Sequence, residues 1–136
     1  MRKRAKNNNI TRRKRIKLRI RKRLSGTPQC PRVSVFRSDK YTYAQAICDT
    51  TGKTIASAST REPEVQQRGE GLEVSFAPNE SKSSKGVRCA MALGLVLSER
   101  CKQHSVEKVV FDRNGYVYHG RIKAVAEGLR EGGLKL

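Results

Sequence analysis

Residues 32–59 read RVSVFRSDKYTYAQAICDTTGKTIASAS, and this stretch decides the fold. It holds three short segments rich in β-branched and aromatic residues, which predict strands at Arg32–Ser38, Tyr43–Asp49 and Thr54–Ser59. The links between them are too short for a crossover, so neighbouring strands must run antiparallel. The stretch therefore predicts an antiparallel meander.

Two helical patterns flank one further strand. Ser81–His104 repeats apolar residues at helical spacing, and its apolar face is wide enough to lie against a sheet. Lys108–Asp112 (KVVFD) reads as a short buried strand, and Arg121–Glu131 reads as a second helix that Gly132 closes. Because a helix joins it to the meander, we expect the last strand to run parallel to one of the first three. The predicted fold class is α/β: a three-stranded antiparallel meander plus a helix-connected parallel strand in one mixed sheet, with helices packed on it.

Residues 60–80 change in character, because they combine glutamates with Pro63, Pro78, Gly69 and Gly71. Such a composition predicts a linker or an insertion within the body. One exception is the alternation over residues 72–76, which could form a short edge strand.

The N-terminal arm is the most charged part of the chain. Its first 24 residues, MRKRAKNNNITRRKRIKLRIRKRL, carry 13 of the 30 Lys and Arg residues and none of the 12 Asp and Glu residues. Charge this dense opposes compact folding and needs a polyanion, so nucleic acid is the favoured partner. Thr11 can cap a helix over Arg12–Leu24. Because like charges weaken so short a helix, we expect it to form only when phosphates neutralise the arm.

The chain therefore divides into a basic N-terminal arm, residues 1–27, and a globular α/β body, residues 28–136. The body carries no phosphate-binding or catalytic motif, and we expect no enzyme activity, metal or cofactor. Asp112 and His119 could form an acid–base pair, but they read better as a strand end and a loop residue. No apolar run approaches the ~20 residues of a membrane-spanning helix, so we expect no membrane partner.

The cysteines lie at no metal-ligand or redox-motif spacing. Most of them have apolar neighbours, which indicates reduced side chains that serve as small hydrophobes. The four are Cys30, Cys48, Cys89 and Cys101.

Two loops, residues 37–43 and 112–121, hold all four tyrosines of the chain beside several cations. Aromatic rings next to cations suit RNA, whose unpaired bases stack on rings while its phosphates accept hydrogen bonds. We expect Tyr41 and Tyr116 at the surface, and for Tyr43 and Tyr118 the surface and the core remain open alternatives. Asn114-Gly115 is turn chemistry that brings the backbone close to a ligand.

The residues expected to contact RNA are the cations of the arm and the cations, aromatics and turn residues of the body. In the arm they are Arg2, Lys3, Arg4, Lys6, Arg12, Arg13, Lys14, Arg15, Lys17, Arg19, Arg21, Lys22 and Arg23. In the body they are Arg32, Arg37, Ser38, Lys40, Tyr41, Tyr43, Arg113, Asn114, Gly115, Tyr116, Tyr118, His119, Gly120 and Arg121.

Several segments occur in a telling order over nearly the whole chain. After the basic arm come PRVSVFRS at 31–38, YAQ at 43–45, GKTIASAST at 52–60, VFDR at 110–113, YHGR at 118–121 and EGGLK at 131–135. Together they resemble the family of large-subunit ribosomal protein eighteen, of the bacterial and organellar type. Asp39 and Tyr41 depart from its pattern, which often has Asn and His there, and an Asp would repel phosphate.

The resemblance implies a structural, non-enzymatic protein of the large ribosomal subunit. It implies that the arm and loops grip 5S rRNA in the central protuberance, and that the protein contacts 23S rRNA and neighbouring ribosomal proteins there. It also implies a cytoplasmic ribosome, with an organellar one left open. The segment 61–80 is longer and more acidic than is common in the family, so no role is carried over to it.

Two other classes of function deserve comparison. A DNA-binding regulator could use a basic arm, but base readout needs a polar helix or ribbon face, which the body helices lack. A nuclease-like enzyme would need clustered carboxylates for metal, and the strand ends offer only Asp49 and Asp112. The sequence therefore favours structural binding to RNA.

Overall fold

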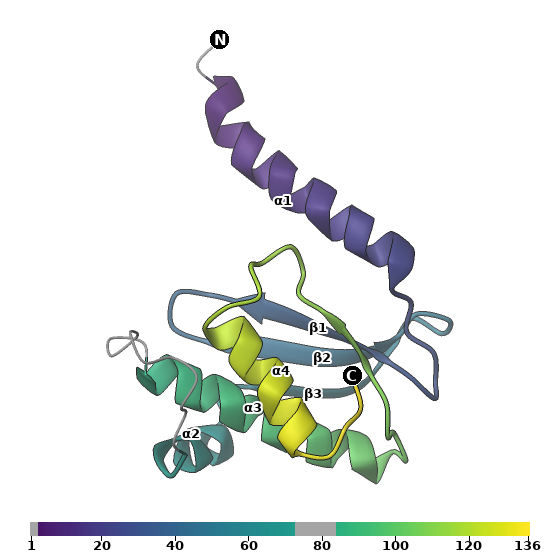
Figure 1. The fold of residues 1–136 in the computed structure, drawn as a ribbon, viewed down its shortest axis with the longest axis vertical. Coiled ribbons are helices and arrows are strands. Elements are labelled where there is room, and N and C mark those ends of the chain that lie inside the picture. Colours follow the sequence, from purple (N-terminus) through teal and green to yellow (C-terminus); the bar gives the residue numbers. More distant parts are fainter. Residues whose placement is uncertain (1–2, 73–83) are drawn as a thin grey trace.

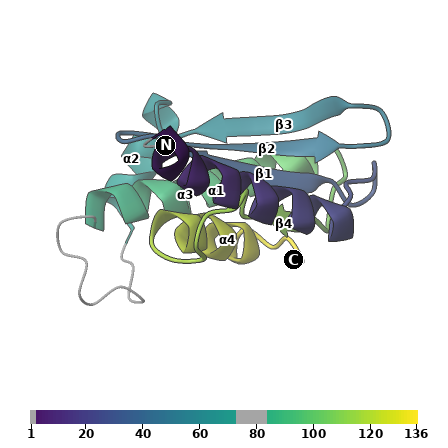
Figure 2. The ribbon, with the colours of Figure 1, turned by 90° about the horizontal axis from the view of Figure 1, so that it is seen from above.

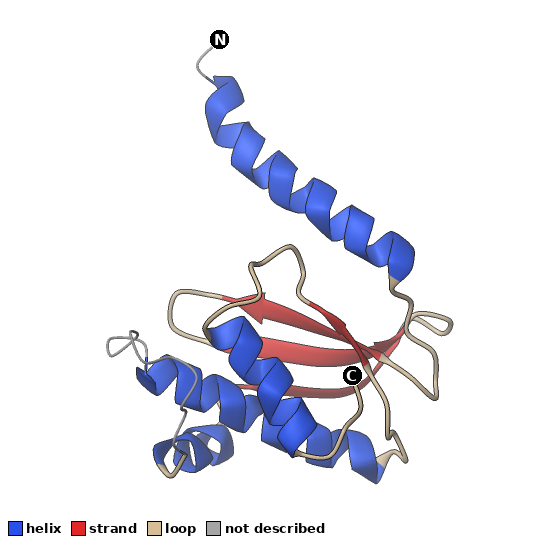
Figure 3. Ribbon diagram, viewed as in Figure 1, coloured by secondary structure: helices blue, strands red, loops and turns tan. Residues whose placement is uncertain are grey.

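The computed structural model describes residues 3–72 and 84–136, with the backbone alone at 3–11, 13 and 84. The elements in chain order are α1 (Lys3–Arg23), β1 (Arg32–Arg37), β2 (Thr42–Cys48), β3 (Lys53–Ser59), α2 (Pro63–Glu70), α3 (Ser84–Gln103), β4 (Val110–Asp112) and α4 (Arg121–Glu131). Figures 1 and 3 show α1 extending away from a body that holds all the other elements. Figure 2 shows α3 and α4 on one face of the sheet.

The sheet has four strands in the order β3-β2-β1-β4. β1 pairs antiparallel with β2, and β2 with β3, while β4 lies parallel to β1. This confirms the predicted meander and its helix-connected parallel strand. The last strand is shorter than predicted, because Lys108 makes only an isolated bridge to Lys135 in the C-terminal tail.

The core lies between the sheet and the helices. Alternate residues of the inner strands point into it, and the longest fully buried side chains come from the two packed helices. Its members include Val33, Val35, Ala44, Ala46, Leu93, Leu97, Val125 and Leu129. Full burial of each Val or Leu side chain contributes about 1.5–3 kcal/mol, so these few positions hold the body together without the arm.

The predicted linker contains a helix that the composition concealed. α2 begins with Pro63, and Glu64 in its first turn and Arg68 in its last turn complement the helix dipole. Val65 is fully buried, and Gly69 lies against Cys89 of α3. The linker prediction was wrong here because one buried apolar residue in eight produces no periodicity. Apart from Leu72, the predicted edge strand lies outside the described residues.

The helix of the arm is longer than predicted. α1 begins at Lys3 rather than Arg12, so Thr11 lies inside the helix and the prediction that it caps the helix was wrong. No Gly or Pro interrupts residues 3–11, so nothing in the chain stops the helix there. The dependence of this helix on phosphate stays a prediction.

The two body helices match the predicted ones closely. α3 is described from Ser84, and the earlier part of the predicted helix lies outside the described residues. α4 has the predicted bounds, and its end is closed by two backbone hydrogen bonds, from the Gly132 N–H to the Gly128 carbonyl and from the Gly133 N–H to the Arg130 carbonyl. α3 and α4 pack at the closest possible distance, because a Cβ at Gly128 would lie 3.0 Å from Cα of Gly94 and would overlap the carbonyl oxygen of Met91.

We predict that Gly128→Ala separates α3 from α4 and lowers the free energy of unfolding by about 1–3 kcal/mol, the usual cost of overpacking a core. Urea unfolding followed by circular dichroism measures the change. The matched control is Gly71→Ala, since a Cβ there meets nothing closer than 3.9 Å. Equal stability of the two variants would contradict the close packing described above.

Candidate nucleic-acid interface

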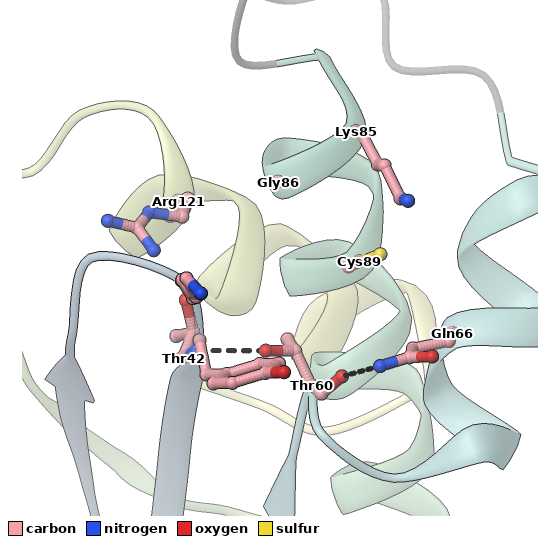
Figure 4. A pocket seen from close by; sticks show the side chains of 9 residues that line it. Thr42, Thr60, Gln66, Lys85, Gly86, Cys89 and Arg121 are labelled. Atoms are coloured by element: carbon pink, nitrogen blue, oxygen red, sulfur yellow. Dashed lines mark hydrogen bonds between the residues drawn. The ribbon is translucent and has the colours of Figure 1, made fainter.

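The body presents a pocket of about 370 Å³ at the end of the sheet where β1 turns into β2. Lys40 and Tyr41 come from that turn, Lys85 from the first turn of α3, and Arg121 from the first residue of α4. Figure 4 shows Arg121 and Lys85 on either side of the first turn of α3. Three cations from three separate elements therefore surround one space.

The floor of this pocket is held by a network of hydrogen bonds. Thr42 donates its N–H to Oγ1 of Thr60 at 2.9 Å, and Thr60 donates its N–H to the Thr42 carbonyl at 2.9 Å. The side-chain amide of Gln66 donates to the Thr60 carbonyl at 3.0 Å, which ties α2 to β2 and β3 (Figure 4). These bonds fix the floor of the pocket, and among the cations Arg121 is itself held by a hydrogen bond to Ser38.

The charges around the pocket favour an anion. Burial, followed by the like charge of Arg37, lowers the pKa of Arg121. Neither α3 nor α4 has an acidic residue in its first turn, where the helix dipole favours negative charge. Lys85 and Arg121 occupy those turns instead. Cations at the positive end of a helix are unfavourable alone, and an anion between them would relieve that repulsion.

Arg121 also fastens the two predicted RNA-binding loops together. Its guanidinium donates to the Ser38 carbonyl at 3.0 Å, although the two residues are far apart in sequence. The loop 112–121 is held further by Arg113, which donates to the Tyr116 carbonyl at 2.7 Å. The structure thus brings residues 37–43 and 112–121 side by side, a contact that the sequence analysis did not predict.

The tyrosines differ from the prediction. Tyr116 is buried, so the prediction of a surface position was wrong: its hydroxyl accepts from the Arg37 N–H at 3.2 Å, and the Arg37 guanidinium lies 5.1 Å from its ring. Tyr118 is 41% exposed, whereas Tyr41 and Tyr43 are half-buried. Tyr116 therefore helps to hold the loop in place, and Tyr118 is the tyrosine of this loop whose side chain is exposed to solvent.

Two further predicted contacts are structural residues of the body. Asn114 is buried and donates its N–H to Asp112, while His119 beside Tyr118 is exposed. Arg32 is only 7% exposed, and its guanidinium is bound by Asp49 and Asp112. A guanidinium that two carboxylates already neutralise has little left to offer a phosphate, so Arg32 and Asn114 do not belong to the candidate interface.

Most cations of the arm are available to a partner. Where side chains are described, Lys14, Arg15, Arg19, Lys22 and Arg23 are exposed, and Arg21 lies 3.8 Å from Asp112. Arg2 lies outside the described residues. The arm thus reaches the body as a helix, and most of the cations whose side chains are described on it are exposed.

Sequence reasoning missed three residues of this interface. Lys85 lines the pocket, Arg61 lies 5.5 Å from the Tyr41 ring, and Phe36 is 50% exposed beside Tyr43. A signal for Lys85 was present, since a basic first turn is unusual in a helix. Phe36 could have been found from the alternation of β1, whose buried Val33 and Val35 leave it on the open face.

Other chemistry finds little support in the described part of the chain. The four cysteines are free, and burial raises the pKa of Cys101 to about 11, so its thiol stays protonated. No group of three or more His, Cys, Asp or Glu side chains there could hold a metal ion. None of the described helices is long and apolar enough to cross a membrane.

Comparison with known proteins gives a consistent result. A family model described as ribosomal L18 of archaea, bacteria, mitochondria and chloroplasts matches residues 5–136. The large ribosomal subunit protein uL18 of Desulfatibacillum aliphaticivorans is 50% identical over 119 residues, which cover 88% of both chains. The uL18 proteins of Sorangium cellulosum and Symbiobacterium thermophilum are 45% and 48% identical, over 92% and 93% of this chain and 95% and 94% of theirs.

Asp49 gives the fold a predictable dependence on pH. Hydrogen bonds from Arg32, followed by that from the Gly26 N–H, lower the pKa of Asp49 to about 2. A carboxyl whose pKa is lower in the folded state than its unfolded value of ~3.9 stabilises the fold above that value, and this contribution disappears as the pH falls through about 2.

We therefore predict that Asp49→Asn lowers the free energy of unfolding at pH 7, and that its difference from the wild type narrows as the pH falls from about 4 towards 2. Urea unfolding at a series of pH values measures this difference. Asp39→Asn, at an exposed carboxyl, serves as the control. A gap that stays constant over this range would show that Asp49 titrates normally in the folded protein.

Proposed function

The chain belongs to the ribosomal L18 family of large-subunit ribosomal proteins, and we propose that it binds 5S rRNA in that subunit and helps attach it to 23S rRNA in the central protuberance. Its relatives are named as ribosomal proteins, and the protein is a component of the ribosome rather than an enzyme. Neighbouring proteins of the central protuberance would complete its contacts.

The observation that carries the proposal is the separation of charge within one chain. The first 24 residues hold 13 cations and no acid, whereas the body has its own apolar core and a nearly balanced surface. Such an arm binds phosphates through charge and is largely indifferent to sequence. The arm therefore supplies affinity, and the body must supply the choice of RNA.

The pocket and its loops are suited to that choice. Lys40, Lys85 and Arg121 surround a space that a phosphate would fill, and the first turns of α3 and α4 line it. Tyr118 and His119 stand exposed on the adjoining loop, where a ring can stack on an unpaired base. In this proposal, the grouping of cations beside exposed rings is what recognises the shape of a folded RNA.

Deletion of residues 1–24 should weaken RNA binding and flatten its salt dependence, while the body stays folded. If the arm neutralises 6–10 phosphates, the affinity of the intact protein falls by roughly 10³–10⁵ between 50 and 200 mM salt. Filter binding or fluorescence anisotropy across this salt range measures both slopes. An unchanged slope after deletion would show that the arm is not the main electrostatic contact.

Arg121→Ala should reduce the preference for 5S rRNA over an unrelated structured RNA by about tenfold, because one charge-assisted hydrogen bond contributes about 1.5–3 kcal/mol. Lys40→Ala should act in the same direction without disturbing any hydrogen bond of the loop. Lys53→Ala, at the turn between β2 and β3, is the matched control.

The measurement is competition between 5S rRNA, the unrelated RNA and duplex DNA at fixed salt. If Arg121→Ala and Lys40→Ala lose affinity equally for every competitor, the pocket contributes charge but no specificity. Tighter binding of the wild type to duplex DNA would contradict the proposed function itself.

A further inference from the structure

Arg32 lies at a junction where the arm, the sheet and the loop 112–121 meet. Its Nε and Nη2 donate to the two oxygens of Asp49 at 3.0 Å each, and its Nη1 donates to Oδ2 of Asp112 at 2.7 Å. Asp112 is fully buried. An ion pair this deep has a large desolvation cost, so it is weak evidence for stability and better explained by a role in fixing geometry.

Asp49 connects this junction to the end of the arm. Its Oδ2 accepts the Gly26 N–H at 2.6 Å, and its own N–H donates to the Gly26 carbonyl at 2.9 Å. Gly26 also has no room for a side chain, because a Cβ there would overlap the Ile47 carbonyl oxygen and lie 2.5 Å from the Arg32 nitrogen. The segment that joins α1 to β1 is thus held at one point of the sheet.

Asp112 connects the same junction to the loop. Its Oδ1 accepts the Asn114 N–H at 2.8 Å, while its Oδ2 faces Arg21 of α1 at 3.8 Å. Asn114 has a φ of 54°, a left-handed conformation that this bond helps to hold. Beside it, Ile20, Leu24, Phe111 and Tyr118 line a hollow of about 490 Å³ between α1 and the loop.

We propose that Arg32, Asp49 and Asp112 are positioning residues, which fix the direction in which the arm leaves the body relative to the loop 112–121. Their effect on RNA binding rests on the proposed function, but their effect on the end of the arm does not. Without them the arm keeps its charge but loses its orientation, and only a fraction of molecules then presents arm and loop together.

If charge alone governed RNA affinity, substitution of an aspartate would strengthen binding, whereas the proposal expects it to weaken binding. Asp49→Asn raises the net charge from +18 by one, so simple attraction to phosphate should make RNA binding tighter. Orientation predicts weaker binding. An Asn at residue 49 turns its amide nitrogen towards either Gly26 or Arg32, and each of these groups is itself a donor. The sign of the change therefore separates the two explanations.

The first measurement is amide hydrogen exchange of the full-length free protein by nuclear magnetic resonance. We expect the Gly26 amide to exchange slowly in the wild type and at least about tenfold faster in Asp49→Asn, while buried amides of α3 keep their rates. A Gly26 amide that exchanges in the wild type as freely as in an unstructured peptide would overturn the proposal without any reference to RNA.

The second measurement is affinity for 5S rRNA at fixed salt. We expect Asp49→Asn to bind about tenfold more weakly, which corresponds to a competent fraction of about one tenth, with an unchanged salt slope. Glu131→Gln changes the charge equally at an exposed carboxyl outside both the junction and the two loops, and it should bind at least as tightly as the wild type. Equal tightening by both substitutions would overturn the proposal.

Gly26→Ala repeats the test without any change of charge, and it serves if Asp49→Asn does not fold. We expect it to free its own amide and to weaken binding, with Gly71→Ala as the matched control. Unchanged exchange and affinity in Gly26→Ala would also overturn the proposal. If the wild type shows no preference for 5S rRNA, the proposed function fails, and amide exchange alone then decides whether the junction holds the arm.

Discussion

The structure depends on one buried arginine, Arg32, in a chain whose other described arginines are mostly exposed. Arg32 begins β1, which pairs with both β2 and β4, so its ion pairs with Asp49 and Asp112 join the ends of three strands. Two of the few acidic residues of the chain are used here, and one of them, Asp112, is fully buried. This local neutrality allows a strongly cationic arm to start beside an ordinary core.

Periodicity was sufficient to predict most of this fold. The meander and both body helices are long enough for alternation or helical spacing to register, and their apolar faces meet across one interface. α2 could not be predicted from periodicity, because its only buried residues are Val65 and Gly69, and Gly69 lies close to α3. A helix held by two positions and by ion pairs such as that between Arg68 and Glu99 resembles a linker in composition.

The candidate site was predictable in its location but not in its details. Sequence singled out the two loops by their tyrosines and cations, but it predicted neither that they are adjacent nor which ring faces the solvent. Tyr116 and Tyr118 have similar neighbours, and only the distance to Arg37 decides that Tyr116 is the buried one. The ion pairs of Arg32 were out of reach for a related reason: its partners Asp49 and Asp112 lie far away in the sequence, at the ends of β2 and β4.

The starts of α3 and α4 bear on the proposed contribution of the body to RNA binding, since the body has only a small excess of charge. Each helix places a cation in the first turn, where a cation costs about 0.3–1 kcal/mol and an acid would have been favourable. The first turns of α3 and α4 both line one pocket, and each cation there is unfavourable beside the positive end of its own helix dipole. An anion in the pocket would lie close to both cations. In the proposed function, a phosphate in this pocket offsets that small local cost, whereas the arm attracts phosphates through a large and diffuse charge. The pocket would therefore respond to the position of a phosphate, whereas the arm would respond only to the number of phosphates nearby.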